Sequence, residues 1–154
     1  MNPSSPNIPA NISPDISAGI AAALGNGLPE LLLHFVTVLI LWAIGVGIYT
    51  MVTPYHEREL IERGNTAAGI VLAGATIAIA LPLAALLATS GRVIDILVWG
   101  VVAVALQLLT VGVVSLALRG LKRMVEADNI AGAMVVAAAQ ISVALMNAAA
   151  MVPN

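Results

Sequence analysis

Uncharged polar side chains recur at helical spacing in the last part of the chain. Asn129, Gln140 and Asn147 are separated by 11 and then 7 residues. At about 100° per residue, both steps return to within about 20° of the same direction around an α-helix. Gln107 and Thr76 also lie near the middle of long apolar stretches. A row of amides either lines a hydrated path for a solute or joins neighbouring helices by hydrogen bonds.

Residue types that carry out catalysis form no pattern typical of an enzyme. The chain has no cysteine, which excludes disulfides and thiolate metal sites. It also shows no nucleophile elbow and no phosphate-cradling loop. The run containing His56, Glu57 and Glu59 could form a weak metal cluster, but a solvent-exposed helix face is the more ordinary interpretation. We therefore predict no enzymatic activity and no cofactor.

The composition indicates a protein whose solvent is the lipid bilayer. Hydrophobic residues make up 60% of the chain and charged residues 9%, against about 45–50% and about 25% in soluble domains. Too few polar side chains remain to cover a soluble surface. The formal net charge of −2, without a basic aromatic face, excludes nucleic acid as a partner.

Four uncharged stretches are long enough to cross a bilayer, which takes about 20 residues of α-helix. Their apolar residues run continuously, whereas the strands of a membrane β-barrel alternate. Helices satisfy their own backbone in lipid. The sequence therefore predicts an all-α integral membrane protein with four transmembrane helices, at Leu31–Val52, Thr66–Thr89, Ile96–Leu118 and Ile130–Val152.

Residues 1–30 contain no Lys or Arg, so they lack the basic region of a secretory signal. Four prolines near the start predict a flexible external tail. A short amphipathic helix is expected within it, with Ser13 as N-cap and Gly25-Asn26-Gly27 as its stop.

The distribution of cations predicts the orientation in the membrane. The first and third connections hold five of the six cations, and the second holds only Arg92. Because Lys and Arg collect in cytoplasmic loops, the first and third connections are expected inside the cell. Both termini are then expected outside the cytoplasm. The five cations are Arg58, Arg63, Arg119, Lys122 and Arg123.

One junction between apolar stretches occurs twice. "ELIERGNTAAGI", from Glu59 to Ile70, is followed 64 positions later by "RMVEADNIAGAM", from Arg123 to Met134. Each copy ends one apolar stretch and opens the next, so both point the same way across the membrane. We predict two parallel-oriented two-helix repeats, at 31–89 and 96–152, unlike the inverted repeats of many transporters.

Polar residues in the two junctions are expected to shape the turns. The pairs Arg58–Glu62 and Lys122–Glu126 are each four residues apart, a spacing at which an ion pair supplies about 0.2–0.5 kcal/mol. Asn65 and Asn129 precede apolar helices and are placed to cap them. Thr53-Pro54 is expected to cap and open a short helix over "YHERELIER" at the inner surface. The plainest role for all these residues is to end and start helices.

The chain resembles a bacterial inner-membrane family catalogued as domain of unknown function 350, which is built from a pair of two-helix repeats. The resemblance lies in "TPYHERELIERGNTAAGI", in "LPL" at 81–83, in "WG" at 99–100 and in the terminal "NAAAM" at 147–151. Two departures are His56, where Asp is usual, and Ala150, where Cys is common. The resemblance implies location and topology and brings no established reaction.

Small residues are concentrated in the second and fourth apolar stretches. They allow helices to approach closely, which is how helices associate in lipid. We therefore expect a homo-oligomer whose cytoplasmic turns dock a protein partner. The alternative is a small channel or carrier with a polar path along Gln107, Gln140 and Asn147. The small residues are Gly69, Ala73, Gly74, Ala78, Gly132, Ala133, Ala137, Ala138 and Ala144.

Overall fold

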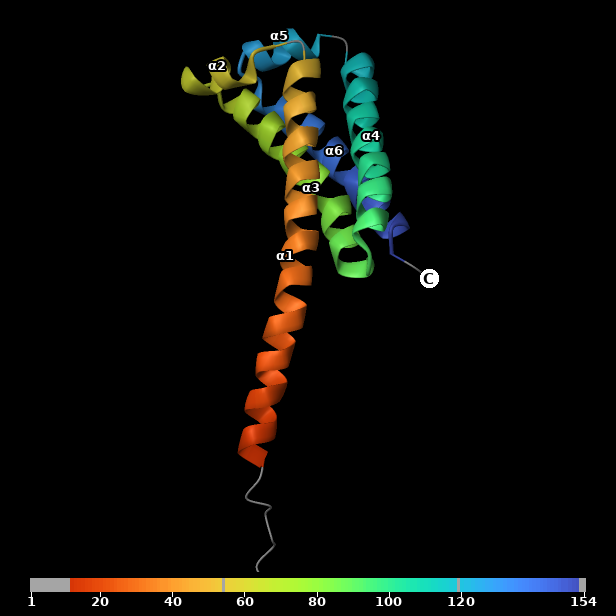
Figure 1. Ribbon diagram of the computed structural model, residues 1–154. Helices are drawn as coiled ribbons and strands as arrows, with labels where there is room; N and C mark the ends of the chain where they lie inside the picture. The colour runs from red at the N-terminus through yellow and green to blue at the C-terminus, as the bar shows by residue number, and fades with distance from the viewer. Residues whose placement is uncertain (1–11, 54, 119, 153–154) are drawn as a thin grey trace, which may run out of the picture. The chain divides into compact units, whose positions relative to one another are not determined.

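The structure is a computed structural model that describes residues 12–53, 55–118 and 120–152, with the backbone alone over 12–15. The described residues form helices joined by short turns (Figure 1). This confirms the predicted all-α class. In chain order the helices are α1 (Ile12–Val52), α2 (Glu57–Glu62), α3 (Thr66–Thr89), α4 (Val93–Ala117), α5 (Leu121–Glu126) and α6 (Ile130–Ala150).

Four of these helices are long and apolar enough to cross a membrane. They are α3, α4, α6 and the part of α1 over Ile16–Val52. The four predicted spans are therefore present, within a few residues of the expected bounds for the last three. The first begins earlier than the sequence suggested.

The helix stop expected at Gly25-Asn26-Gly27 is wrong. Residues 1–33 form a unit of their own, and in its described part α1 runs from Ile12 through this glycine pair. Ser13 consequently lies inside the helix and not at its N-cap. A glycine costs only about 1 kcal/mol relative to alanine inside a helix, and the flanking alanines and leucines favour helix. Residue 30 is thus no helix boundary. Three of the four early prolines, Pro3, Pro6 and Pro9, lie outside the described residues.

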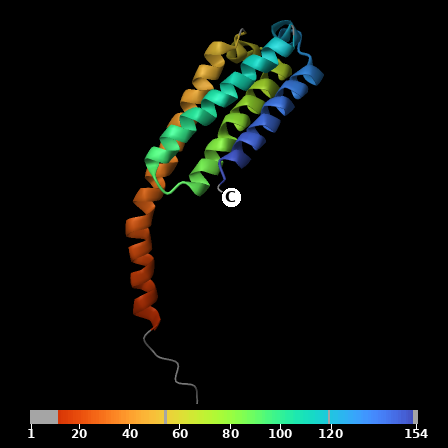
Figure 2. The same cartoon turned by 90° about the vertical axis from the view of Figure 1, so that its right-hand side faces the viewer.

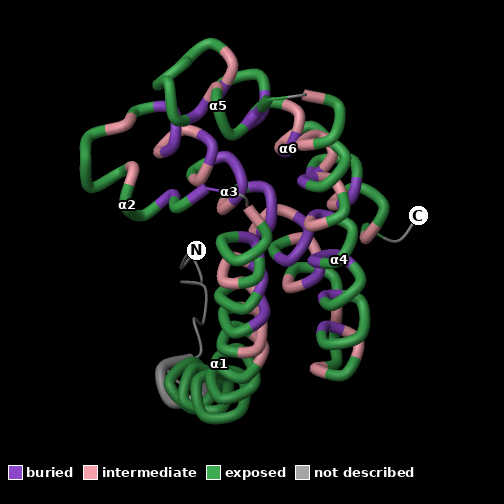
Figure 3. Tube along the Cα trace, turned by 90° about the horizontal axis from the view of Figure 1, so that it is seen from above, coloured by how far each residue is buried: buried purple, intermediate pink, exposed green. Residues whose placement is uncertain are grey.

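In the second unit, His34–Asn154, α3 is the central helix. It packs against α6 most closely, and also against α4 and the two short helices. Figure 2 shows α3 and α6 running side by side. In Figure 3 the buried positions follow one another along α3, whereas α4 and α6 each bury one side.

Small residues bring these helices close together, as the composition of the second and fourth spans predicted. A Cβ added at Gly74 of α3 would lie 2.5 Å from the Cβ of Ala137 in α6. In α1, a Cβ at Gly45 would lie 3.0 Å from the side chain of Val104. The indole nitrogen of Trp42 donates a hydrogen bond to the carbonyl of Thr76, at 3.2 Å. Trp42 therefore packs against α3.

Apolar side chains form two buried clusters. One joins α1, α3 and α4 around Ile79, Leu83 and Ile96. The other joins the short helices to the first turns of α3 and α6, around Val71, Val125 and Val136. The second cluster fixes the two junctions on the ends of the long helices. Figure 1 shows α2 and α5 at the same end of the helical bundle.

Candidate functional site

The intramembrane amides join α4 to α6. Gln107 Nε2 donates a hydrogen bond to the Gln140 carbonyl at 3.0 Å, and Asn147 Nδ2 donates to the Ala103 carbonyl at 3.3 Å. Gln107, Gln140 and Asn147 are all buried. In the described part of the chain, the side-chain oxygens of both glutamines have no hydrogen-bond partner. The amides therefore link neighbouring helices, while the side-chain carbonyl oxygens of Gln107 and Gln140 stay without a described hydrogen bond.

Two other residues of the predicted polar stripe act locally. Asn129 is exposed and caps α6, accepting a hydrogen bond from the Gly132 amide at 3.0 Å. The Thr76 hydroxyl donates to the Leu72 carbonyl of its own helix at 2.5 Å. The stripe thus consists of a cap at the junction end and a buried link further along α6. Thr76 does not extend it.

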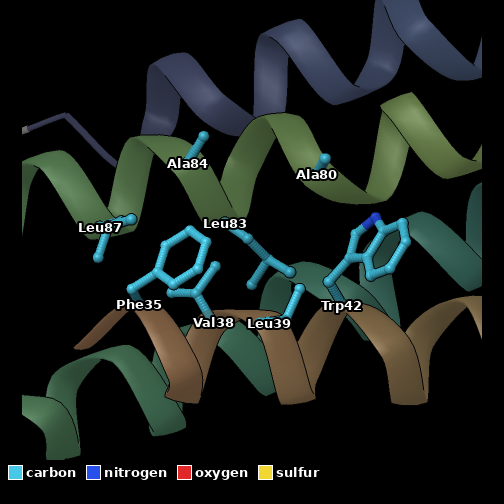
Figure 4. Close-up of a pocket in the computed structure, with 8 residues that line it drawn as sticks. All are labelled: Phe35, Val38, Leu39, Trp42, Ala80, Leu83, Ala84 and Leu87. Carbon is cyan, nitrogen blue, oxygen red and sulfur yellow. The ribbon is translucent and has the colours of Figure 1, made fainter. Parts of the chain in front are cut away.

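The grooves between the long helices are apolar. Figure 4 shows one groove between α1 and α3 whose eight lining residues include Phe35, Leu83 and Trp42. A second groove, of about 450 Å³, lies between α4 and α6, and Asn147 and Thr110 are its polar residues. Neither Gln107 nor Gln140 lines either groove. A continuous polar path along the three amides is therefore not supported by this geometry.

The two junctions repeat one backbone pattern. Gly64 and Asp128 occupy equivalent positions with positive φ, +80° and +54°. The residues that follow, Asn65 and Asn129, each accept a hydrogen bond from the amide three residues on. The predicted caps of α3 and α6 are therefore present. The backbone N–H of each asparagine in turn donates to the backbone carbonyl five residues earlier, on Leu60 and Met124.

The junctions also bond to each other. Asn65 Nδ2 donates to the Val125 carbonyl at 2.9 Å, and the Ala67 amide donates to Asp128 Oδ1 at 2.7 Å. The first turn of α3 thus receives two side-chain acceptors, one from each junction. A carboxylate at this position is favourable because a helix N-terminus carries partial positive charge. The sequence analysis did not identify Asp128, although Asp128 is the residue equivalent to Gly64 in the second copy of the repeat.

The ion pair predicted for the first junction is wrong. There the ion pair joins Glu59 to Arg63, and no described ion pair joins Arg58 to Glu62. The predicted pair and the observed pair both have i,i+4 spacing, and the observed pair lies one residue closer to the C-terminal end of α2. In the second junction Lys122 and Glu126 do pair, at 3.8 Å.

The helix after Thr53-Pro54 begins later than expected. Pro54 lies outside the described residues. The Thr53 hydroxyl donates to the carbonyls of Tyr49 and Thr50 in the last turn of α1. The residue before α2 is His56, whose side chain makes no capping bond. Thr53 therefore closes α1 and does not open α2.

A second polar cluster lies between α1 and α2. Tyr49, Tyr55 and Glu57 are 1%, 4% and 3% exposed. Within the described residues, none of these hydroxyl and carboxylate oxygens meets hydrogen-bond geometry, although the Tyr49 and Thr53 hydroxyls lie beside Glu57 and the Tyr49 hydroxyl lies beside that of Tyr55. Glu57 is thus no part of a solvated helix face. Among the described residues no group of three His, Cys, Asp or Glu side chains is placed to hold a metal, so the weak metal cluster considered for His56, Glu57 and Glu59 is not formed.

Burial changes the acid chemistry of this cluster. Loss of solvent raises the pKa of the Glu57 carboxyl from 4.5 to about 7, and the nearby Tyr49 and Thr53 hydroxyls only partly oppose the rise. Burial and the charge of Glu57 raise the pKa of Tyr55 to about 12. The Glu57 carboxyl therefore changes its protonation state near neutral pH. In the sequence, the signal that could have predicted this cluster is the presence of Tyr49, Tyr55 and Glu57 around the end of the first span.

Comparisons with known proteins identify the family of this chain. Residues 23–151 match the family described as Domain of Unknown Function (DUF350). The UPF0719 inner membrane proteins YjfL of Escherichia coli K12 and of Escherichia coli O157:H7 are each 31% identical to this chain over 104 residues. The similarity covers 68% of this chain and 79% of each relative. No solved structure matches the chain at a significant level. With most of its length inside the family match, the chain belongs to the DUF350 family and is homologous to the inner membrane protein YjfL.

Proposed function

We propose that this inner membrane protein is a non-enzymatic, self-associating helical protein whose cytoplasmic junctions dock a partner protein. The observation that carries the proposal is the pair of direct hydrogen bonds between the junctions, from Asn65 to Val125 and from Ala67 to Asp128. Two turns far apart in sequence thereby form one rigid polar surface. A rigid surface loses little conformational entropy when a partner binds.

The orientation and the repeat form part of the same proposal. The described cations of the first and third connections are exposed at one end of the bundle, on and beside α2 and α5. This distribution favours that end inside the cell. The matching caps and turns 64 residues apart support two parallel-oriented two-helix repeats, with both termini outside the cytoplasm.

Self-association is supported by an unused face of α6. Its small residues at Gly132, Ala133 and Ala137 face the packed interior wholly or partly, whereas Ala138 and Ser142 are exposed. Two small residues four apart are the pattern by which membrane helices approach one another. Native mass measurement in lipid nanodiscs tests this proposal. We expect an oligomer that Ala138→Leu dissociates, whereas Val101→Leu on the exposed side of α4 leaves it intact; a monomeric wild type would contradict it.

The docking surface is tested by photo-crosslinking in living cells. A photoreactive residue at Arg63 or Arg123 is expected to capture the same partner protein, since both lie exposed beside the bonded junctions. The control is the same residue at Val101, which is 58% exposed on the apolar side of α4. Capture should disappear when Asn65→Leu separates the junctions. Equal capture from Val101, or capture of further copies of this chain alone, would contradict docking.

The channel alternative is tested by solute flux into liposomes. Hydrogen bonds from Gln107 and Asn147 to backbone carbonyls support a packing role for the amides. We expect purified wild-type protein to produce no flux above empty liposomes. If flux appeared and was lost in Gln140→Leu with assembly unchanged, the polar path would replace the docking proposal.

A further inference from the structure

The buried oxygens of Tyr49, Tyr55 and Glu57 lie close to one another, yet none of them meets hydrogen-bond geometry with a described residue. Four such atoms are concentrated in one cluster: two hydroxyl oxygens and both oxygens of one carboxylate. Buried polar groups in folded proteins are normally bonded, because an unbonded one costs about 1–3 kcal/mol. A cluster of several such atoms is therefore a candidate place for a bound water or ion.

The surroundings of the cluster supply no positive charge. Tyr49 lies in the last turn of α1, which contains no basic residue. The C-terminal end of a helix carries partial negative charge, which favours a nearby cation. Tyr55 packs among apolar residues of α3, α5 and α6. No described ion pair involves Glu57, and its neighbour Arg58 is exposed.

The chemistry of the ligand follows from the atoms and their charge. Oxygen-only ligands suit hard cations such as the alkali and alkaline-earth ions. The cluster holds a single carboxylate, so a divalent ion would leave uncompensated positive charge in a buried place, which is costly. An organic ammonium would need open space, but all four oxygens are closed to solvent. The remaining class is a small dehydrated monovalent cation.

A route to the cluster is present. Glu57 also lines an open groove of about 740 Å³ between α1, α2 and α3. The groove is the most polar one described and includes Thr50, His56 and Glu62. The groove therefore brings solution on the α2 side of the membrane up to Glu57, whose carboxylate oxygens lie just beneath its surface.

We propose that Tyr49, Tyr55 and Glu57 form a binding site for a monovalent alkali cation at the junction end of α1. The carboxylate supplies the charge, and the two hydroxyl oxygens replace part of the hydration shell. This site is separate from the docking surface at Asn65 and Asp128, and either proposal can hold without the other.

The test uses the full-length protein in lipid nanodiscs, with KCl or NaCl exchanged for N-methylglucamine chloride at constant ionic strength. At about pH 8, where Glu57 is ionised, K⁺ or Na⁺ should raise the melting temperature in a saturable way. Equilibrium binding of ⁸⁶Rb⁺ or ²²Na⁺ should be saturable at one ion per chain. Glu57→Gln should lose both effects, and Tyr49→Phe should weaken binding.

The matched control is Glu59→Gln, an exposed glutamate of the same short helix. It should bind the ion as wild type does. Circular dichroism of Glu57→Gln, with unchanged helix content, separates loss of the site from loss of the fold. The proposal would be overturned if wild type showed no saturable binding or if Glu57→Gln bound the ion equally well. It would also be overturned if only acid stabilised the protein, because the site would then take only a proton.

Discussion

At the scale of single residues, the described polar side chains divide by whether they donate a hydrogen bond to another helix or junction. Gln107, Asn147 and Asn65 donate to backbone carbonyls of other helices or junctions. Tyr49 and Glu57 are buried just as deeply without described partners. The first group therefore accounts for packing, and the second is where a ligand or a proton acts.

Glu57 should make stability depend on pH. Its pKa of about 7 in the folded protein lies above the value of 4.5 for a free carboxyl. Between these values the folded state holds a proton that the unfolded state has lost, so stability falls as pH rises through this window. The total loss is about 3 kcal/mol. It is complete above about pH 7 and absent below 4.5.

Thermal unfolding of the detergent-solubilised protein across this window measures the effect, in N-methylglucamine salt so that no small cation offsets it. Glu57→Gln should flatten the pH profile, because a neutral amide has no proton to lose. Glu59→Gln should leave the slope unchanged. A wild-type profile that is level across the window would refute the prediction.

At the scale of elements, the caps and the small-residue contacts could be read from the sequence, whereas the ends of α1 and α2 could not. Asn65 and Asn129 precede apolar runs, a local pattern with one ordinary structural outcome. The continuation of α1 through Gly25 and Gly27 depended on the balance of weak propensities along the whole helix. The burial of Glu57 depended on contacts between α1 and α2, which no local pattern encodes.

Removing the two caps should have unequal effects. Asn129→Leu loses a bond within its own junction and should destabilise the protein by about 0.5–2 kcal/mol. Asn65→Leu should cost more, because Asn65 also donates to the Val125 carbonyl and so joins the two junctions. Chemical denaturation in mixed micelles compares the two variants. Equal effects would show that the bond between junctions contributes nothing to stability.

The contact between α3 and α6 should tolerate no added side chain. Gly74→Val places its Cβ against Ala137, where the backbone itself must move, and overpacking of this kind costs about 1–3 kcal/mol. The matched control is Gly69→Ala, since a Cβ there meets no atom within 4 Å. Gly69→Ala should be neutral or slightly stabilising. Melting temperatures measured in one detergent distinguish the two, and similar losses for both would contradict close α3–α6 packing.

At the scale of the whole molecule, composition determined the class because lipid imposes strong constraints on any chain that crosses it. The chain is 60% hydrophobic and contains four long uncharged runs. In lipid such runs must satisfy their own backbone hydrogen bonds, which helices do. Function is not constrained in this way. A docking surface and a cation site each depend on a few side chains, such as Asp128 and Glu57, whose surroundings emerge only when distant segments meet.

The orientation of the bundle decides which solution each site faces, and it has a direct test. We expect both junctions in the cytoplasm, because the exposed cations Arg58, Arg63, Lys122 and Arg123 share one end of the helices. The chain has no cysteine, so single cysteines can be introduced without background. In intact cells, a membrane-impermeant maleimide should label Arg92→Cys and leave Lys122→Cys unlabelled. After the membrane is permeabilised, both should react, which shows that Lys122→Cys was protected by the bilayer and not by the fold. Labelling of Lys122→Cys alone in intact cells would reverse the topology and place the proposed docking surface outside the cell, where no cytoplasmic partner reaches it.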